Sequence, residues 1–188
     1  MRRTALLLAS MTLVLIVAGG VALAASFISC PGGGLDCSGT NADDRIKGTD
    51  SDEKIYGLGG SDTIDGNGGQ DVLIGDDNFT TDRSMDGDDK LDGGPGDDGL
   101  HGYGGSDTFV GGSGADIIDA GDLESTNVPG THNTVRAGSG DDDVFSVNGV
   151  PDSIDCGTGS EIRGDSAVVD GLDKVAKNCE DPTIVTPQ

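Results

Sequence analysis

Apolar residues recur every nine positions along the middle of this chain, between residues 39 and 119. When the chain is divided into nonapeptide units that start at Gly39, the eighth position is apolar in eight of the nine units. These residues are Ile46, Ile55, Ile64, Leu73, Leu91, Leu100, Phe109 and Ile118. One apolar residue between polar neighbours indicates a short strand that buries a single side chain. Because such a strand is not stable alone, we expect the strands to stack into a continuous apolar column.

Glycine and aspartate keep the same nine-residue register. Eight of the nine units begin with Gly. The fourth position is Gly in six units, as Gly60, Gly69, Gly87, Gly96, Gly105 and Gly114. The sixth position is Asp in seven units, as Asp44, Asp62, Asp71, Asp89, Asp98, Asp107 and Asp116, with Glu53 and Thr80 as the exceptions. General enrichment in Gly and Asp would not hold fixed phases, so the repeat is real. The glycines predict a tight turn over the first six residues of each unit.

The repeat becomes irregular after residue 119. A spacer leads into a degenerate unit at 128–136, a regular unit at 137–145 with Asp142 in the sixth position, and another degenerate unit at 147–155. The repeat region is therefore 39–155. Within it the unit 75–83 departs most from the pattern, and we expect this unit to bulge outward or to be poorly ordered.

The charge balance defines the class of partner. The formal net charge is −23, with 34 acidic residues against 11 Lys and Arg. The chain lacks the basic clusters that bind nucleic acid phosphates or an anionic membrane surface, so we predict neither partner. Cations are the natural partners. High charge with 3% aromatic residues is also typical of disordered chains, which leaves a disordered acidic calcium buffer as an alternative.

The repeated carboxylates predict a calcium site. The sixth residue lies where the turn enters the strand, so stacking brings carboxylates and turn carbonyls of adjacent coils together. Ca²⁺ takes about six to eight oxygen ligands of both kinds. The units carry no regular His or Cys, which disfavours zinc and copper.

The unit Gly111–Asp119 matches the pattern G-G-x-G-x-D-x-U-x at every specified position, and the unit that starts at Gly93 matches it likewise. The region 39–155 therefore resembles the RTX (haemolysin-type) calcium-binding repeats. The resemblance implies an all-β fold, a right-handed parallel β-roll with two nonapeptides per coil and Ca²⁺ between successive turns. The ligands that it implies are Asp44, Asp62, Asp71, Asp89, Asp98, Asp107, Asp116, Asp142, Gly60, Gly69, Gly87, Gly96, Gly105 and Gly114.

Two nonapeptides per coil would divide the acidic residues between two edges. One edge would hold Asp44, Asp62, Thr80, Asp98 and Asp116, and the other Glu53, Asp71, Asp89 and Asp107. The resemblance then implies that the best sites are Asp71–Asp89, Asp89–Asp107 and Asp98–Asp116, followed by Asp44–Asp62, with a gap at Thr80.

The N-terminal residues 1–24 have the basic start, the apolar run and the small-residue end of a secretory signal peptide. We expect cleavage after Ala24. An uncleaved membrane anchor and a lipoprotein processed at Cys30 stay open as alternatives. Cleavage would leave an N-terminal cap segment at 25–38 and a C-terminal cap and tail at 156–188, with no membrane insertion.

The four cysteines lie in two pairs on either side of the repeat region. Export permits disulfides, and four cysteines allow three connectivities. We expect Cys30–Cys37 and Cys156–Cys179, each of which closes a local loop at one end of the repeats.

These features predict a secreted calcium-binding protein, extracellular or at the cell surface, that acts as a structural or interaction module. The sequence contains no H-E-x-x-H and no G-x-S-x-G, so we expect no enzymatic activity. The disordered buffer and an accessory module of an exported enzyme are the alternatives. Calcium is the predicted partner; the sequence does not identify a protein or glycan partner.

Overall fold

A computed structural model describes residues 25–76, 85–121, 132–159, 164–179 and 182–185. These residues form two eight-stranded sheets in which all strand pairs are parallel. The described part contains no helix, and so none with the length and apolar character that a membrane crossing needs. The predicted signal peptide, 1–24, lies outside the described residues.

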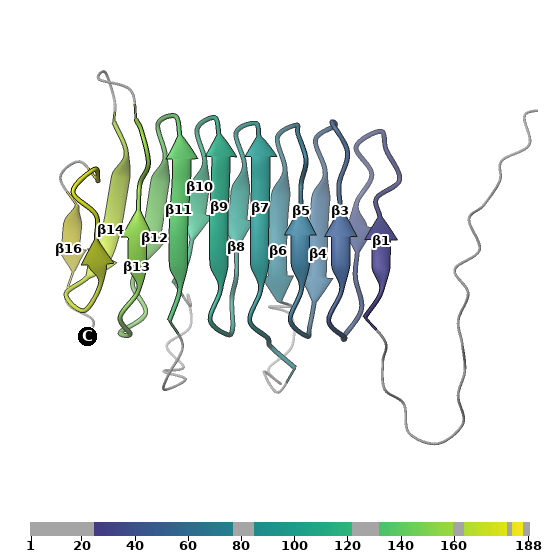
Figure 1. The fold of residues 1–188 in the computed structure, drawn as a ribbon, viewed down its shortest axis with the longest axis horizontal. Helices are drawn as coiled ribbons and strands as arrows, with labels where there is room; N and C mark the ends of the chain where they lie inside the picture. Colours follow the sequence, from purple (N-terminus) through teal and green to yellow (C-terminus); the bar gives the residue numbers. More distant parts are fainter. Residues whose placement is uncertain (1–24, 77–84, 122–131, 160–163, 180–181, 186–188) are drawn as a thin grey trace, which may run out of the picture.

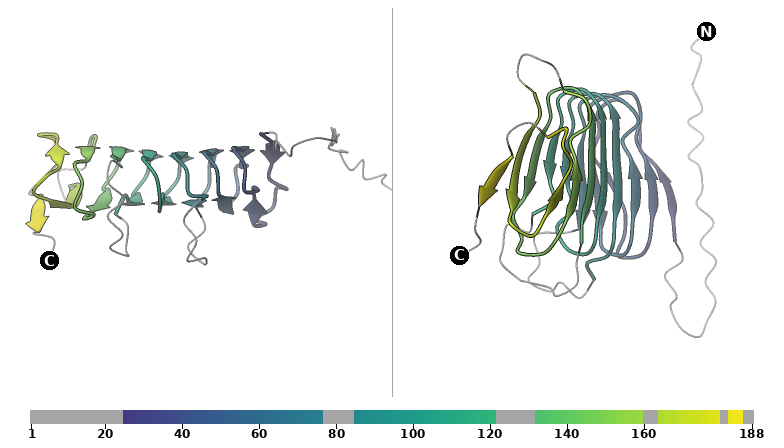
Figure 2. Two further views of the ribbon diagram at one scale, coloured as in Figure 1. Left: turned by 90° about the horizontal axis from the view of Figure 1, so that it is seen from below. Right: turned by 60° about the vertical axis from the view of Figure 1, so that its left-hand side comes forward.

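Successive strands alternate between the two sheets, which face each other as two layers (Figures 1 and 2). Sheet A consists of β1 (Phe27–Ser29), β3 (Arg45–Lys47), β5 (Thr63–Asp65), β7 (Lys90–Pro95), β9 (Thr108–Ser113), β11 (Thr134–Ser139), β13 (Ser153–Asp155) and β15 (Lys174–Val175). Sheet B consists of β2 (Cys37–Ser38), β4 (Lys54–Leu58), β6 (Val72–Asp76), β8 (Gly99–His101), β10 (Ile117–Asp119), β12 (Asp143–Ser146), β14 (Ser166–Asp170) and β16 (Thr183–Val185). This arrangement confirms the predicted all-β parallel β-roll.

The core is the apolar column that the sequence predicts. Each central strand turns one large apolar side chain into the space between the sheets, and these side chains are fully buried. Partners in the register are equivalent residues of successive coils, such as Ile46 with Ile64 in sheet A and Ile55 with Leu73 in sheet B. The eighth position of each unit therefore supplies the apolar contacts that hold the two layers together.

The coils differ in length along the roll. Ile46 and Ile64 pair at a separation of 18 residues, whereas Ile64 pairs with Leu91, 27 residues away. In sheet B, Leu73 pairs with Leu100 at the same longer separation. Both sheets thus have nine additional residues between Asp76, at the end of β6, and Lys90, at the start of β7, a stretch that contains most of the degenerate unit 75–83. The prediction that this unit bulges outward falls mainly on 77–84, which lies outside the described residues. A second long coil joins Phe109 to Val135.

The sheets extend beyond the repeat region 39–155. At the N-terminal end β1 pairs with β3 and β2 pairs with β4. At the C-terminal end β14, β15 and β16 continue both sheets. The segments expected to form caps therefore contribute the terminal strands of the roll.

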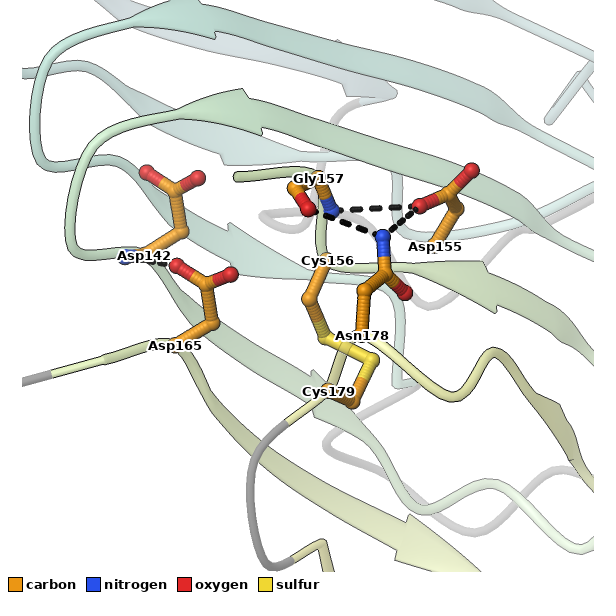
Figure 3. The surroundings of a disulfide bond; sticks show 7 residues. All are labelled: Asp142, Asp155, Cys156, Gly157, Asp165, Asn178 and Cys179. Carbon is orange, nitrogen blue, oxygen red and sulfur yellow. Dashed lines mark hydrogen bonds between the residues drawn. A yellow bond between two sulfur atoms is a disulfide. The ribbon is translucent and has the colours of Figure 1, made fainter. Parts of the chain in front are cut away.

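Disulfides join Cys30 to Cys37 and Cys156 to Cys179, which confirms the predicted pairing. Figure 3 shows the second disulfide. Beside it the side-chain amide of Asn178 donates hydrogen bonds to Oδ1 of Asp155 and to the carbonyl oxygen of Gly157. These bonds and the disulfide tie the C-terminal segment to the turn after β13.

Candidate metal centre

The sixth-position carboxylates are buried inside the roll. Each lies just before a strand, at the point where the turn enters the sheet, and none is more than 4% exposed. These residues are Asp44, Glu53, Asp62, Asp71, Asp89, Asp98, Asp107, Asp116 and Asp142. By contrast, the preceding residues Asp43, Asp88 and Asp97 are exposed, as expected for solvated turn residues. Burial of ionisable groups in a row requires that something compensate their charge.

One oxygen of each buried aspartate in this row links two coils. Oδ1 accepts a hydrogen bond from the backbone N–H of the sixth residue of the preceding coil. Asp98 Oδ1, for example, accepts from the N–H of Asp71, and Asp116 Oδ1 accepts from that of Asp98, at 2.8 and 2.9 Å. The bonds of this kind among the repeat carboxylates have the acceptors Asp62, Asp71, Asp89, Asp98, Asp107, Asp116 and Asp142.

The other oxygen has no donor in much of the array. Buried Oδ2 atoms without a hydrogen-bond partner occur, among the described residues, at Asp62, Asp71, Asp89, Asp98, Asp116 and Asp142. A buried carboxylate oxygen without a partner is costly, because nothing replaces the water that solvated it. Six such oxygens at one position of a repeat are a row of sites that suit a cation.

Backbone carbonyls lie beside these oxygens. A Cβ built on Gly93 would stand 2.5 Å from Oδ2 of Asp98 and 2.7 Å from the carbonyl oxygen of Gly111, in the next coil. Glycine is therefore required at Gly93, since a side chain would fill the space that the two oxygens border. The same arrangement recurs at Gly57, Gly66, Gly75 and Gly111.

The fourth-position glycines allow the turns to stack closely. Gly105 has a φ of +99°, and a Cβ on it would overlap the carbonyl oxygen of Gly87 in the preceding coil. The predicted ligand glycines Gly60, Gly69, Gly96 and Gly114 also take a positive φ and lie against the backbone of an adjacent coil. Their carbonyls face neighbouring turns, and their role as ligands stays a prediction.

The electrostatics of the row reflect its burial. Burial raises the pKa of Asp89 to about 9, with the charge of Asp76 as the next cause that acts in this direction. For the same first reason the pKa of Asp62 and of Asp116 rises to about 7, and that of Asp71 and of Asp142 to about 6. Without a cation, these carboxyl groups would hold protons at a pH where an exposed Asp is ionised.

At the N-terminal end of the row, protein donors satisfy the second oxygen. The backbone N–H and the hydroxyl of Thr40 both donate to Oδ2 of Asp44, at 2.7 and 2.8 Å. Thr49 donates to both oxygens of Glu53, from its N–H to Oε2 and from its hydroxyl to Oε1. Asp44 was predicted as a ligand, and its second oxygen already has two donors here.

At the C-terminal end of sheet A, side chains take over the same role. Asn133 holds the sixth position; its Oδ1 accepts from the N–H of Asp107 and its amide nitrogen donates to the carbonyl oxygen of Ala120 at 2.6 Å. In the next coil Oδ2 of Asp152 accepts from Ser146 and Asn148. Among the described residues, the row beside sheet A therefore has donors at Asn133 and Asp152, whereas the row beside sheet B has an oxygen without a donor as far as Asp142.

The structure corrects the predicted division of residues between the edges. The predicted neighbours Asp44–Asp62, Asp89–Asp107 and Asp98–Asp116 are adjacent. The predicted site Asp71–Asp89 is wrong, because Asp89 stacks on Asp62 and Asp71 stacks on Asp98.

The reason for this correction is that both sheets pass over one unit, which shifts every later residue to the opposite edge. The expected gap at Thr80 is also wrong, since Asp62 and Asp89 are direct neighbours. Thr80 itself lies outside the described residues.

Sequence reasoning missed Asp76. This residue holds the second position of its unit, where the repeat pattern has glycine, and it is fully buried. Its Oδ2 accepts from the N–H of Gly87 at 3.2 Å, whereas its Oδ1 has no partner. Burial, and next the charge of Asp86, raise the pKa of Asp76 to about 9. The sequence does contain a sign of this buried acid, since Asp76 stands where the repeat pattern has glycine.

Side chains alone do not form the metal centres. Among the described residues, no three carboxylate, imidazole or thiol groups converge on one point. The donor set is one or two carboxylate oxygens with turn carbonyls nearby, which is a set that Ca²⁺ accepts and that Zn²⁺ disfavours.

Comparison with known proteins identifies the repeat. Residues 38–73 and 84–118 each match the family model of the RTX calcium-binding nonapeptide repeat, which describes four copies of the repeat. The two matched segments leave out residues 74–83, which include the degenerate unit 75–83. A search of curated proteins found no match. The match identifies residues 38–73 and 84–118 as RTX-type nonapeptide repeats, a kind of repeat that binds Ca²⁺.

Proposed function

We propose that this chain is an exported protein whose β-roll is completed by Ca²⁺ at the row of sixth-position carboxylates. Outside the cell it would act as a calcium-stabilised structural or interaction module. The observation that carries the proposal is the row of buried carboxylate oxygens without a hydrogen-bond donor.

The residues that would hold calcium are those of the central coils. They are Asp62, Asp71, Asp89, Asp98, Asp107, Asp116 and Asp142, with carbonyl oxygens of the adjoining turns. Bound Ca²⁺ supplies the positive charge that the buried carboxylates lack, and it also reduces the repulsion within a chain of net charge −23.

Export is supported by two features. The first 24 residues have the composition of a secretory signal. The chain also has two disulfides, which persist in oxidising compartments. The proposal assigns no catalytic role to the chain.

The composition favours a second candidate, a disordered acidic calcium buffer. It explains the charge of −23 and the scarcity of aromatic residues. It does not explain why the apolar eighth position and the acidic sixth position keep one register. Small-angle scattering distinguishes the two, because a module becomes compact when calcium binds whereas a buffer stays expanded.

Calorimetric titration of the mature chain with Ca²⁺ tests the proposal, with Mg²⁺ as the control ion. We expect several Ca²⁺ sites with a Kd on the order of 10⁻⁴–10⁻³ M, and weaker uptake of Mg²⁺, which demands a stricter octahedral geometry. At a calcium concentration tenfold above Kd, each site stabilises the folded form by about 1.4 kcal/mol. Circular dichroism should therefore show strand content that rises with calcium. Equal strand content in chelator and in millimolar calcium would contradict the proposal.

A further inference from the structure

The site with the most unusual chemistry lies between β6 and β7, where both sheets have nine additional residues. Two buried carboxylates meet there, Asp76 from the end of β6 and Asp89 from the turn before β7. Asp76 is fully buried and Asp89 is 2% exposed. Each has one oxygen without a hydrogen-bond partner, Oδ1 of Asp76 and Oδ2 of Asp89.

The backbone at Gly75 and the charge of Asp76 both indicate that the two groups are close. A Cβ built on Gly75 would touch Oδ2 of Asp89, and Asp76 is the next residue in the chain. After burial, the charge of Asp76 is also the strongest influence that disfavours ionisation of Asp89. Asp76 therefore has the same relation to Asp89 that Thr40 has to Asp44, one residue after a glycine that borders the carboxylate.

The backbone supports this equivalence. At the second position of the units that start at Gly57, Gly66, Gly93, Gly102 and Gly111, the residue takes a positive φ. Thr40, Thr49 and Asp76 hold this position without a positive φ. Asn148, the second residue of the degenerate unit 147–155, likewise has no positive φ, and it donates to Oδ2 of Asp152.

The three residues differ in what they offer to the carboxylate. Thr40 gives Asp44 two donors, its N–H and its hydroxyl. Asp76 gives Asp89 no donor. The N–H of Asp76 donates to the carbonyl oxygen of Gly102, and the side chain of Asp76 is a second acid. Two buried acids without a donor between them require a shared cation or a shared proton.

We propose that Asp76 and Asp89 together hold a divalent cation of the Ca²⁺ class, in a two-carboxylate site that the nonapeptide pattern does not specify. This site rests on the proposed calcium function and extends it to the coil where the repeat is interrupted. The ion would be bound from both sides of the additional residues, by Asp76 before them and by Asp89 after them. Two carboxylates bind Ca²⁺ more tightly than one, so this site fills first.

The test compares the wild type with Asp76→Asn, Asp76→Thr and the control Asp88→Asn. Asn keeps the shape of Asp76 and an oxygen for the N–H of Gly87. Thr installs the residue that serves Asp44 and Glu53. Asp88→Asn removes an exposed charge from the same turn. The measurements are calorimetric Ca²⁺ titration and thermal unfolding with and without calcium.

We expect both Asp76 variants to bind one Ca²⁺ fewer than the wild type and to lose the tightest binding step, by about tenfold or more in Kd. We also expect them to unfold at a higher temperature than the wild type when calcium is absent. The control should match the wild type in both measurements. Unchanged stoichiometry and affinity in Asp76→Asn and Asp76→Thr would overturn the extra site and indicate a shared proton. Absence of calcium uptake by the wild type would overturn the proposed function as well.

Discussion

The backbone N–H of Asp62 donates a hydrogen bond to Oδ1 of Asp89 at 2.8 Å, although the two residues are 27 positions apart. The same bond joins Asp44 to Asp62 at a separation of 18. The ladder of carboxylates thus continues unbroken although one step of it spans nine additional residues. A repeat whose period is nine allows this, because an excursion of nine residues returns each side chain to its own position.

Replacement of Asp98 by Asn tests the central row. The variant keeps the oxygen that accepts from the N–H of Asp71 but replaces the oxygen without a donor by an amide. We expect the number of Ca²⁺ bound to fall by at least one, with a loss of about 1.4 kcal/mol of stability at a calcium concentration tenfold above Kd. Calorimetry and thermal unfolding in calcium are the measurements.

The matched control for this variant is Asp97→Asn. Asp97 is exposed, yet its Oδ1 also accepts a backbone N–H, that of Ala115 at 2.9 Å. The control therefore removes the same charge from the same turn, and we expect calcium uptake close to that of the wild type. An equal loss in both variants would mean that net charge matters and the buried row does not.

Stability of the metal-free protein should depend on pH in an unusual direction. Burial raises the pKa of Asp62 to about 7 and that of Asp89 to about 9 in the folded state, from 3.8 in the unfolded chain. A raised folded pKa contributes stability that is fully present below pH 3.8 and is lost as the pH rises through about 7 to 9. We expect metal-stripped protein to unfold at a higher temperature at pH 5 than at pH 8, because the sites are protonated at the lower pH.

Calcium should reverse this trend. Since Ca²⁺ binds the ionised carboxylates, its affinity should fall as the pH drops from 8 to 5. Thermal unfolding followed by circular dichroism, at both pH values and with and without calcium, measures the two effects together. A metal-free protein that is most stable at pH 8 would contradict the predicted burial of these groups.

Asn133→Asp should extend the calcium row by one position. The amide nitrogen of Asn133 now donates to the carbonyl oxygen of Ala120, and a carboxylate would place an oxygen without a proton there. We expect metal-free stability to fall by roughly 1–3 kcal/mol, which is the cost of an unsatisfied buried group. Calcium should restore this loss and bind with one additional equivalent. Unfolding curves that shift equally with and without calcium would argue against a new site.

The apolar column should be sensitive to truncation. Leu100 is completely buried, so Leu100→Ala should destabilise the calcium-bound protein by about 2–5 kcal/mol. Ile117, on the outer face of β10, is 51% exposed and provides the control. Denaturant unfolding in saturating calcium measures both, and a similar cost for the two variants would contradict the assignment of the core.

Local pattern was sufficient to predict the units themselves. Leu73 and Asp71 could be assigned to the core and to the acidic row from phase alone, because a short strand alternates its faces and a glycine turn resets the alternation in each unit. The disulfides followed from the positions of the cysteines at the two ends. Asp76 was missed because its role depends on Asp89, which lies 13 residues later and beyond the excursion.

By itself the sequence determined the period, the strands, the buried carboxylates and the choice of calcium as the ion, since each depends on residues within one nonapeptide. Only the tertiary structure decided which coils are neighbours. Separations of 18 and 27 residues bring equivalent positions together equally well, so the register of each unit contains no information about which unit lies next to it. Pairing of complete strands made that choice, and with it placed Asp89 on Asp62 and next to Asp76.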